Sequence, residues 1–120
     1  NKEIDKKIQL LVGTWPISNV AIDVASKALI DDVWIMNTIS FLKEGSYFLD
    51  CLASEINWKV VGGTNLYRLY ETPNADDAQN KLANFKIWSR RFTYSKKWIR
   101  LGIPQKKDFK KVSKIFKKLY

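Results

Sequence analysis

The chain has 120 residues, 46% of them hydrophobic, which is enough for one domain with a packed core. It contains no histidine and one cysteine, Cys51. This composition excludes, within the chain, an internal disulfide, a structural zinc site and a Ser-His or Cys-His nucleophile pair. No apolar run reaches the length of a membrane span, and the first residues lack a signal-peptide core. We therefore expect no membrane association and a reducing, cytoplasmic setting.

The positive charge is concentrated at one end of the chain. The formal net charge is +9, but residues 86–120 hold thirteen Lys or Arg against a single acid, Asp108. The rest of the chain is slightly acidic. An excess of this kind indicates anionic partners or a solvated basic face.

The first third of the chain is predicted to be helical. Residues 1–13 form a polar lead-in with some helical periodicity, and Ser18 or Asn19 can cap a helix that runs to about residue 29. Asp31 and Asp32 favour the start of a longer helix that extends to about residue 52. Gly45 interrupts that helix and predicts a bend or close packing. In the helix that runs to about residue 29, the side chains of Val20, Val24 and Leu29 are expected to face inward.

From residue 58 onward the hydrophobic period changes from helical to alternating. We expect strands at 58–61, 65–70, 87–92 and 98–102, with a turn at Gly62-Gly63. A short helix is expected at about 75–84, and a last helix after Pro104. The order is therefore α-α-β-β-α-β-β-α. This order predicts an α/β (α+β) two-layer sandwich with a largely antiparallel four-stranded sheet.

Arg90 and Arg100 lie close to two predicted strand ends with a short connection between them. A guanidinium held on a strand can form two parallel hydrogen bonds to a carboxylate or phosphate, so the pair suits a small ligand with two anionic groups. Arg91 is expected on the opposite face, although the doubled arginine leaves open which of the two faces the site. The alternative from the residues alone is that these are solvated strand arginines or members of structural ion pairs.

Other patterns carry less functional information. Gly62-Gly63-Thr64 lacks the spacing of a phosphate-binding loop, and Ser40-Phe41-Leu42-Lys43 lacks the companion motifs of a serine-lysine enzyme. Cys51 falls on the apolar side of its predicted helix, so we expect a buried thiol. The tryptophans are expected mostly in the core or against the sheet, with Trp15 as the exception.

Three segments resemble one family when taken together: GGTNLYRLY at 62–70, IWSRRF at 87–92 and WIRLGIP at 98–104. In order and spacing they resemble the C-terminal small domain of fold-type I pyridoxal-phosphate enzymes. The branch they resemble is the threonine-phosphate decarboxylase of cobalamin synthesis, a relative of histidinol-phosphate aminotransferase. The match runs from about residue 15 to residue 104. Gly13-Thr14-Trp15-Pro16 resembles the G-P-W segment of the family, with Thr14 in place of the proline.

The resemblance implies roles for two residues. Arg100 occupies the position that grips the substrate α-carboxylate, and Arg90 is implied to contact the phosphate of a phosphorylated amino acid. The Schiff-base lysine, the aspartate for the pyridine nitrogen and the cofactor-phosphate loop of the family lie in a large domain. None of them is matched here, so we assign no catalytic, cofactor-binding or metal-binding residue.

We therefore interpret residues 1–120 as the small domain of a longer enzyme, with residues 1–14 as a lead-in from a large domain. The parent would carry pyridoxal 5'-phosphate and act as a homodimer in the cytoplasm, whereas this chain alone would bind no cofactor and show no turnover. Decarboxylation and transamination are not distinguished. The alternatives are a stand-alone basic module for nucleic acid or other anions and a paralogue without activity. Because the lysine-rich last helix lacks arginine and interleaved aromatics, we do not expect nucleic acid as a partner.

Overall fold

The computed structural model describes residues 1–13 and 17–119. The chain divides into two compact units, Asn1–Met36 and Asn37–Tyr120. The predicted order of helices and strands is confirmed, and a further helix occupies the lead-in. The part of the predicted Trp15 segment that covers residues 14–16 lies outside the described residues.

The first unit consists of α1 (Lys2–Val12), α2 (Asn19–Ala28) and the beginning of α3 (Asp32–Glu55). As predicted, Ser18 caps α2, its Oγ accepting a hydrogen bond from the Ala21 amide at 3.2 Å. No residue of α1 or α2 is buried. The prediction that Val20, Val24 and Leu29 lie inward is therefore wrong for this structure, because the unit has no second layer to cover them. No helix in the described ranges combines the length and apolarity needed to cross a bilayer.

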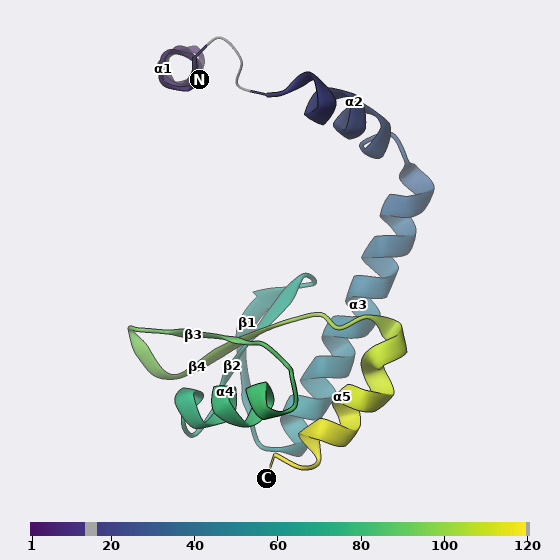
Figure 1. Cartoon of the computed structure of the whole chain (residues 1–120), viewed down its shortest axis with the longest axis vertical. Coiled ribbons are helices and arrows are strands. Elements are labelled where there is room, and N and C mark those ends of the chain that lie inside the picture. The colour runs from purple at the N-terminus through teal and green to yellow at the C-terminus, as the bar shows by residue number, and fades with distance from the viewer. Residues whose placement is uncertain (14–16, 120) are drawn as a thin grey trace. The chain divides into compact units, whose positions relative to one another are not determined.

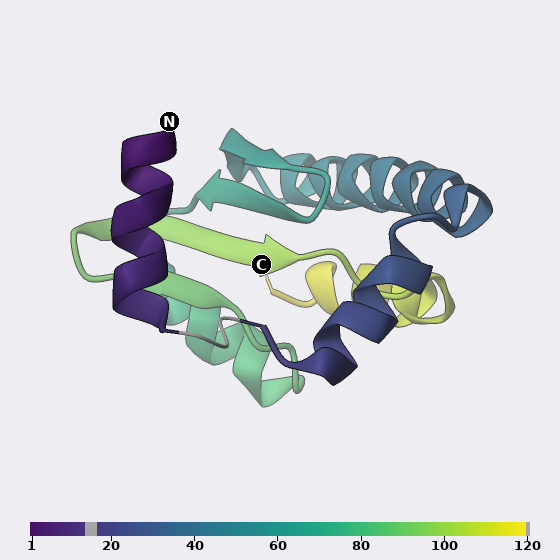
Figure 2. The same cartoon turned by 90° about the horizontal axis from the view of Figure 1, so that it is seen from above.

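The second unit is the predicted two-layer sandwich. Its sheet contains β1 (Lys59–Thr64), β2 (Tyr67–Glu71), β3 (Arg90–Phe92) and β4 (Ser95–Gly102). The strands lie in the order β1-β2-β4-β3, and every neighbouring pair is antiparallel (Figure 2). The other layer contains α3, α4 (Ala75–Asn84) and α5 (Phe109–Phe116), which follows a 3₁₀ turn at Lys106–Asp108. These helices lie on one side of the sheet, and no described helix of this unit covers its other face, which we call the open face (Figure 1).

The core follows from the two-residue alternation of the strands. Ile99 and Leu101 of β4 and Tyr70 of β2 are buried against the helices. The helices supply Leu49, Leu52, Leu82 and Phe116 to the same cluster. Residues one position away on each strand must face the open side. This alternation determines which face of the sheet each of its arginines occupies.

The hairpin between β1 and β2 differs from the prediction. Gly62 and Gly63 were expected to form the turn, but both lie inside β1, and the turn is at Asn65-Leu66. The pairing shifts between Val60 and Gly62, which marks a bulge. Gly63 has a φ of 140°, and a Cβ there would overlap the backbone oxygen of Tyr67. The glycines therefore serve a bulge and a close backbone approach rather than a turn.

Two further predictions are corrected by burial. Cys51 is exposed, not buried, because the inward stripe of α3 runs through Leu49, Leu52 and Ala53 and leaves Cys51 beside it. Trp58 is in the core as expected, but Trp88 is 82% exposed on the open side of the sheet. Trp34 in the first unit is exposed as well. The third strand is also shorter than predicted, since only Arg90–Phe92 of 87–92 pairs in the sheet.

Gly45 allows α3 to pack closely against the segment that follows β4. An alanine Cβ at this position would overlap Cγ2 of Ile103, which packs against the core. Because Cγ2 is part of a β-branched side chain with one preferred rotamer, it cannot easily move away. Of the two predictions for Gly45, close packing is the one observed.

Gly45→Ala should destabilise the chain, although alanine favours helices over glycine by about 1 kcal/mol. Overpacking costs about 1–3 kcal/mol, so we expect the free energy of unfolding to fall by about 1 kcal/mol net. Urea denaturation followed by circular dichroism measures the change. In an Ile103→Leu background, which removes the branch, the same substitution should cost less. An equal or larger loss in that background would contradict the proposed contact.

Candidate functional site

The open face of the sheet contains a hollow of about 320 Å³ that is lined by both predicted arginines. We call it the arginine hollow; besides Arg90 and Arg100 its lining includes Tyr67, Trp88, Ser89 and Gly102. Arg90 of β3 is the register partner of Arg100 of β4. Directly opposite residues on antiparallel strands have Cβ atoms about 4.5–5.5 Å apart. The structure therefore brings the two guanidinium-bearing side chains to one place.

Arg90 and Arg100 differ from the other arginines of the sheet in their surroundings. Among the described residues, no carboxylate forms an ion pair with Arg90 or Arg100. Each guanidinium lies instead over an aromatic ring. The Cζ of Arg100 is 4.9 Å from the centroid of the Tyr67 ring, and the Cζ of Arg90 is 5.7 Å from that of Phe92. Like charges in directly opposite positions repel each other, so this arrangement favours an anion between them.

Arg91 has a different environment from its neighbour. Its Nη1 donates a hydrogen bond to Oδ1 of Asp76, at the start of α4, at 2.6 Å. Its register partner is Ile99, which is buried on the helix side of the sheet. The two adjacent arginines therefore lie on different faces of the sheet: Arg90 lines the hollow, and Arg91 forms an ion pair with Asp76.

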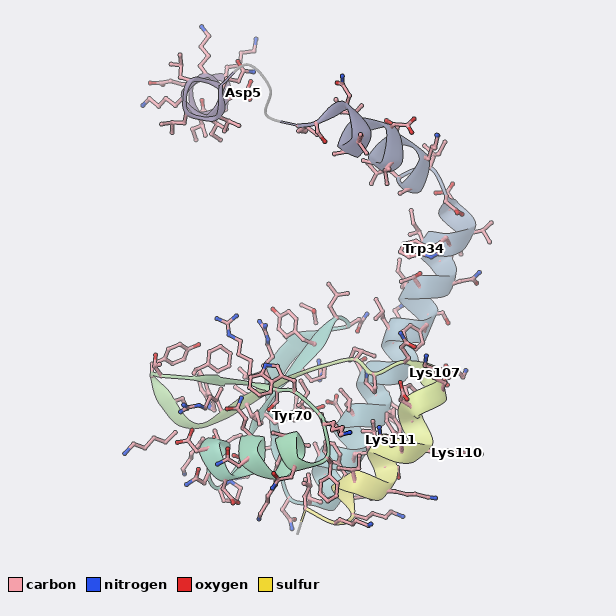
Figure 3. All side chains as sticks on the ribbon, viewed as in Figure 1. Asp5, Trp34, Tyr70, Lys107, Lys110 and Lys111 are labelled. Atoms are coloured by element: carbon pink, nitrogen blue, oxygen red, sulfur yellow. The ribbon has the colours of Figure 1, made fainter. Side chains whose placement is uncertain are left out.

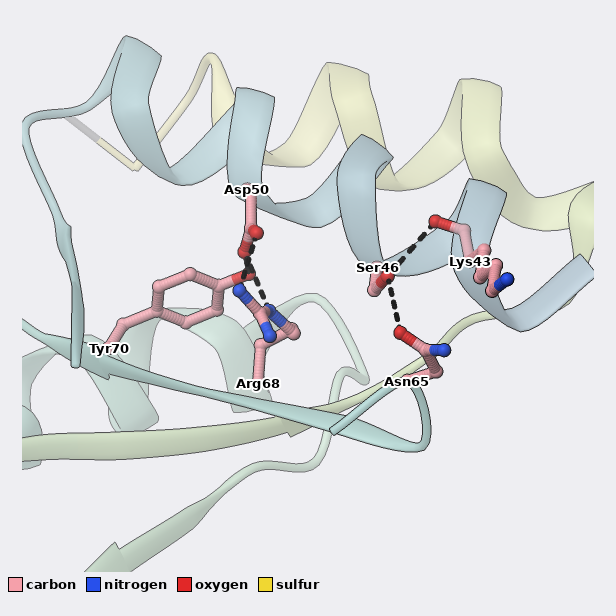
Figure 4. A network of polar contacts seen from close by, with 6 residues as sticks. All are labelled: Lys43, Ser46, Asp50, Asn65, Arg68 and Tyr70. Atoms are coloured by element: carbon pink, nitrogen blue, oxygen red, sulfur yellow. Dashed lines mark hydrogen bonds and ion pairs between the residues drawn. The ribbon is translucent and has the colours of Figure 1, made fainter. Parts of the chain in front are cut away.

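A fourth arginine, Arg68, forms the main polar network beneath the sheet. Its Nε and Nη2 donate to the two carboxylate oxygens of Asp50 at 2.9 and 2.7 Å. The hydroxyl of Tyr70 donates to Asp50 at 2.8 Å (Figure 4). Burial, together with the hydrogen bond to Asp50, raises the pKa of Tyr70 well above its usual range. The hydrogen bond to Asp50 likewise raises the pKa of Arg68. The network ties β2 to α3, and within it the Asp50 carboxylate neutralises the Arg68 guanidinium.

Besides Arg90 and Arg100, five residues line the hollow that the sequence did not identify as site residues: Leu66, Tyr67, Trp88, Ser89 and Gly102. Tyr67 and Gly102 are register partners on β2 and β4, two positions from Leu69 and Arg100 respectively. Period-two alternation from Arg100 could have placed Gly102 on the open face, whereas placing Tyr67 also requires the register of β2 against β4. Trp88 lies just before β3, where no strand register exists to place it. The alternation of residues along a strand could therefore not predict that Trp88 is exposed.

The lysine-rich C-terminal helix is a separate basic surface. The exposed side chains of Lys107, Lys110 and Lys111 extend from the outer side of this segment (Figure 3). Lys106 forms an ion pair with Glu44 of α3 at 2.9 Å. None of these lysines lines the arginine hollow. In the described part of the chain, no group of three or more His, Cys, Asp or Glu side chains could hold a metal ion.

Comparison with known proteins relates this chain to part of two longer enzymes. No family model matches the sequence. A threonine-phosphate decarboxylase from Sinorhizobium sp. is 33% identical over 94 residues, which are 77% of this chain and 27% of that protein. The crystal structure described as a histidinol-phosphate aminotransferase from Erwinia carotovora atroseptica superposes with a TM-score of 0.74. That match has 13% identity and covers 82% of this chain and 29% of the other.

The resemblance to the aminotransferase-like enzymes is confirmed. The sequence match supports it, and the structural match shows the same fold. The chain spans less than a third of the length of each protein that it matches. It therefore resembles a part of such an enzyme, and the activity of a whole enzyme is a matter for proposal.

Repulsion within the arginine hollow leads to a stability prediction. Arg90→Gln should raise the free energy of unfolding by about 0.2–1 kcal/mol in a phosphate-free buffer of low ionic strength, because it removes one of two opposed charges. Urea denaturation measures the change. Arg91→Gln is the matched control, since it removes the same charge from the next residue but also breaks the pair with Asp76. A gain in stability for Arg91→Gln, or a loss for Arg90→Gln, would contradict this account.

The Asp50 network predicts a change at alkaline pH. The unfolded chain releases the Tyr70 proton as the pH rises through about 10, whereas the folded chain retains it because its pKa is raised. The stabilisation of the folded chain that comes from the raised pKa of Tyr70 is therefore fully present below about pH 10 and is lost progressively above it. Tyr70→Phe should make the loss of stability between about pH 10 and 11 shallower, by up to about 1.4 kcal/mol per pH unit. Denaturant titrations at several pH values test this, and identical slopes for both proteins would contradict it.

Proposed function

We propose that this chain supplies the substrate-recognition site of a pyridoxal-phosphate-dependent, aminotransferase-like enzyme that acts on a phosphorylated amino acid. Arg100 binds the α-carboxylate, and Arg90 binds the phosphate. The observation that carries the proposal is the register pairing of Arg90 with Arg100 on the lining of one hollow, with no acid paired to either among the described residues. Two forked donors at this spacing match a ligand with two separate anionic groups.

The chain does not itself fit the cofactor. None of the described residues that line the arginine hollow is a lysine, and the chain lacks a lysine in the sequence context that the family uses. We therefore assign recognition to this chain and the chemistry of the cofactor to the rest of a longer protein. Binding energy from groups remote from the reacting bond can orient that bond, which is the contribution that the arginines would make.

Several features of the parent are part of the same proposal. Residues 1–120 would be its small domain, with residues 1–14 leading in from the large domain, and the parent would be a cytoplasmic homodimer. The relative from Sinorhizobium sp. supports a threonine-phosphate decarboxylase over a transaminase, and we propose cobalamin synthesis as its setting. The coding sequence upstream tests this part, because it should contain the cofactor-binding lysine in frame.

A second candidate is a module that binds single-stranded nucleic acid. Exposed Tyr67 and Trp88 line the hollow with the arginine pair, exposed Tyr94 contacts the Phe92 ring, and bases can stack on such rings. This hypothesis predicts affinity that falls steeply with salt and depends on the aromatic residues more than on Arg100. The substrate-site proposal predicts no such polynucleotide binding.

The proposal is tested by calorimetric titration of the chain with O-phospho-L-threonine and with two ligands that each lack one anionic group. Arg100→Gln should weaken phosphothreonine binding at least tenfold, as expected when a charged hydrogen bond is lost. It should also abolish the preference for phosphothreonine over O-phosphoethanolamine, which has no carboxylate. Arg90→Gln should abolish the preference for phosphothreonine over threonine. Arg91→Gln, the matched control, should leave all three affinities within about twofold.

If Arg90→Gln abolished the preference over O-phosphoethanolamine and Arg100→Gln abolished the preference over threonine, the roles proposed for the two arginines would be reversed. Equal binding by Arg90→Gln, Arg100→Gln and the unmodified chain would overturn the proposal. Retention of a salt-sensitive oligonucleotide complex by Arg100→Gln would favour the second candidate.

A further inference from the structure

The four arginines of the sheet are held in two different ways. Arg68 and Arg91 are paired with the carboxylates of Asp50 and Asp76, on the side of the sheet that the helices cover. Arg90 and Arg100, on the open side, are each held against an aromatic ring. A carboxylate partner neutralises a guanidinium and occupies its donors. A ring holds the guanidinium by its face and leaves both the charge and the N–H donors at its edge available.

The shorter of the two ring contacts is between Arg100 and Tyr67. The Arg100 Cζ lies 4.9 Å from the ring centroid, within the range of a cation–π interaction. Both residues line the arginine hollow. Tyr67 is opposite Gly102 in the register, and a Cβ on Gly102 would meet no other atom within 4 Å. The absence of a side chain at Gly102 leaves space on this face beside the ring and the guanidinium.

We propose that Tyr67 is a positioning residue for the anion site: its ring holds the Arg100 guanidinium in place before a ligand arrives, without neutralising it. An arginine side chain has about 2 kcal/mol of rotamer entropy, part of which is lost when it binds a ligand. A ring contact that already restricts the side chain lowers that cost at the moment of binding. The contact also opposes displacement of Arg100 by the like charge of Arg90. This inference rests on the proposed function, because it assigns Tyr67 a role in the same site.

The central variant is Tyr67→Leu, which removes the ring, compared with Tyr67→Phe, which retains it. Calorimetric titration with O-phospho-L-threonine should show binding that is about threefold to tenfold weaker for Tyr67→Leu. Tyr67→Phe should restore the affinity to within about twofold of the unmodified chain. Tyr47→Leu, an exposed tyrosine of α3 outside the hollow, is the matched control and should change nothing.

A double-mutant cycle shows whether Tyr67 acts through Arg100. In an Arg100→Lys background the planar guanidinium is absent. Tyr67→Leu should there lower the logarithm of the binding constant by less than half as much as it does when Arg100 is present. Thermal unfolding of each variant identifies any that fails to fold. Tyr67→Met, which keeps an apolar side chain without a ring, replaces Tyr67→Leu in that event and should show the same loss.

The outcomes separate this inference from the proposed function. If the unmodified chain binds phosphothreonine and Arg100→Gln does not, but Tyr67→Leu binds as the unmodified chain does, the positioning role is overturned and the substrate site stands. Equal losses for Tyr67→Phe and Tyr67→Leu would overturn the role of the ring as well, because they would assign the effect to the hydroxyl. If Arg100→Gln binds as well as the unmodified chain, both proposals fail together.

Discussion

The pairing of β4 with both β2 and β3 determines what each side chain of the sheet faces. Ile99 and Leu101 of β4 are buried against the helices, so Arg100 between them must lie on the open face. The same register places Arg90 directly opposite it. A slip of one residue in either strand would exchange the two faces and place arginines in the apolar layer. The burial of two aliphatic side chains thus fixes the position of the charged pair, and the site needs no separate framework.

The distribution of charge follows the same division between the two faces. On the covered side, where a lone charge would be costly, Arg68 has two hydrogen bonds to Asp50, and Tyr70 donates a third to the same carboxylate. On the open side water solvates the guanidinium groups, so an unpaired Arg90 and Arg100 can be tolerated. The lysines of the C-terminal segment are a third group, located outside the arginine hollow. The net charge of the chain therefore does not by itself point to the proposed anion site, whereas the lack of acid partners for Arg90 and Arg100 among the described residues does.

The order of the elements, the antiparallel sheet and the proximity of Arg90 and Arg100 could be predicted from the sequence, because these depend on hydrophobic period and chain order. Prediction from the sequence failed where tertiary pairing decides the outcome. Gly62 and Gly63 fit a turn by composition, but the bulge that uses them depends on how β1 aligns with β2. Cys51 was assigned to the wrong side because several apolar residues of α3 could have formed the inward stripe. The contact of Tyr67 with Arg100 joins residues 33 positions apart, so no local pattern could have indicated it.

The two arginines themselves are brought together locally, which distinguishes the site from the network beneath it. Arg90 and Arg100 belong to one hairpin, and Phe92 pairs with Ser95 at its tight end. Pairing of β3 with β4 alone is sufficient to place the two charges opposite each other. Asp50, in contrast, lies on α3 and reaches β2 across 18 residues of sequence. A hairpin of three and eight residues is only marginally stable alone, and here it also brings two like charges together. It must therefore be held by packing of Ile99 and Leu101 on the helices, which makes the proposed anion site dependent on the burial of these two side chains.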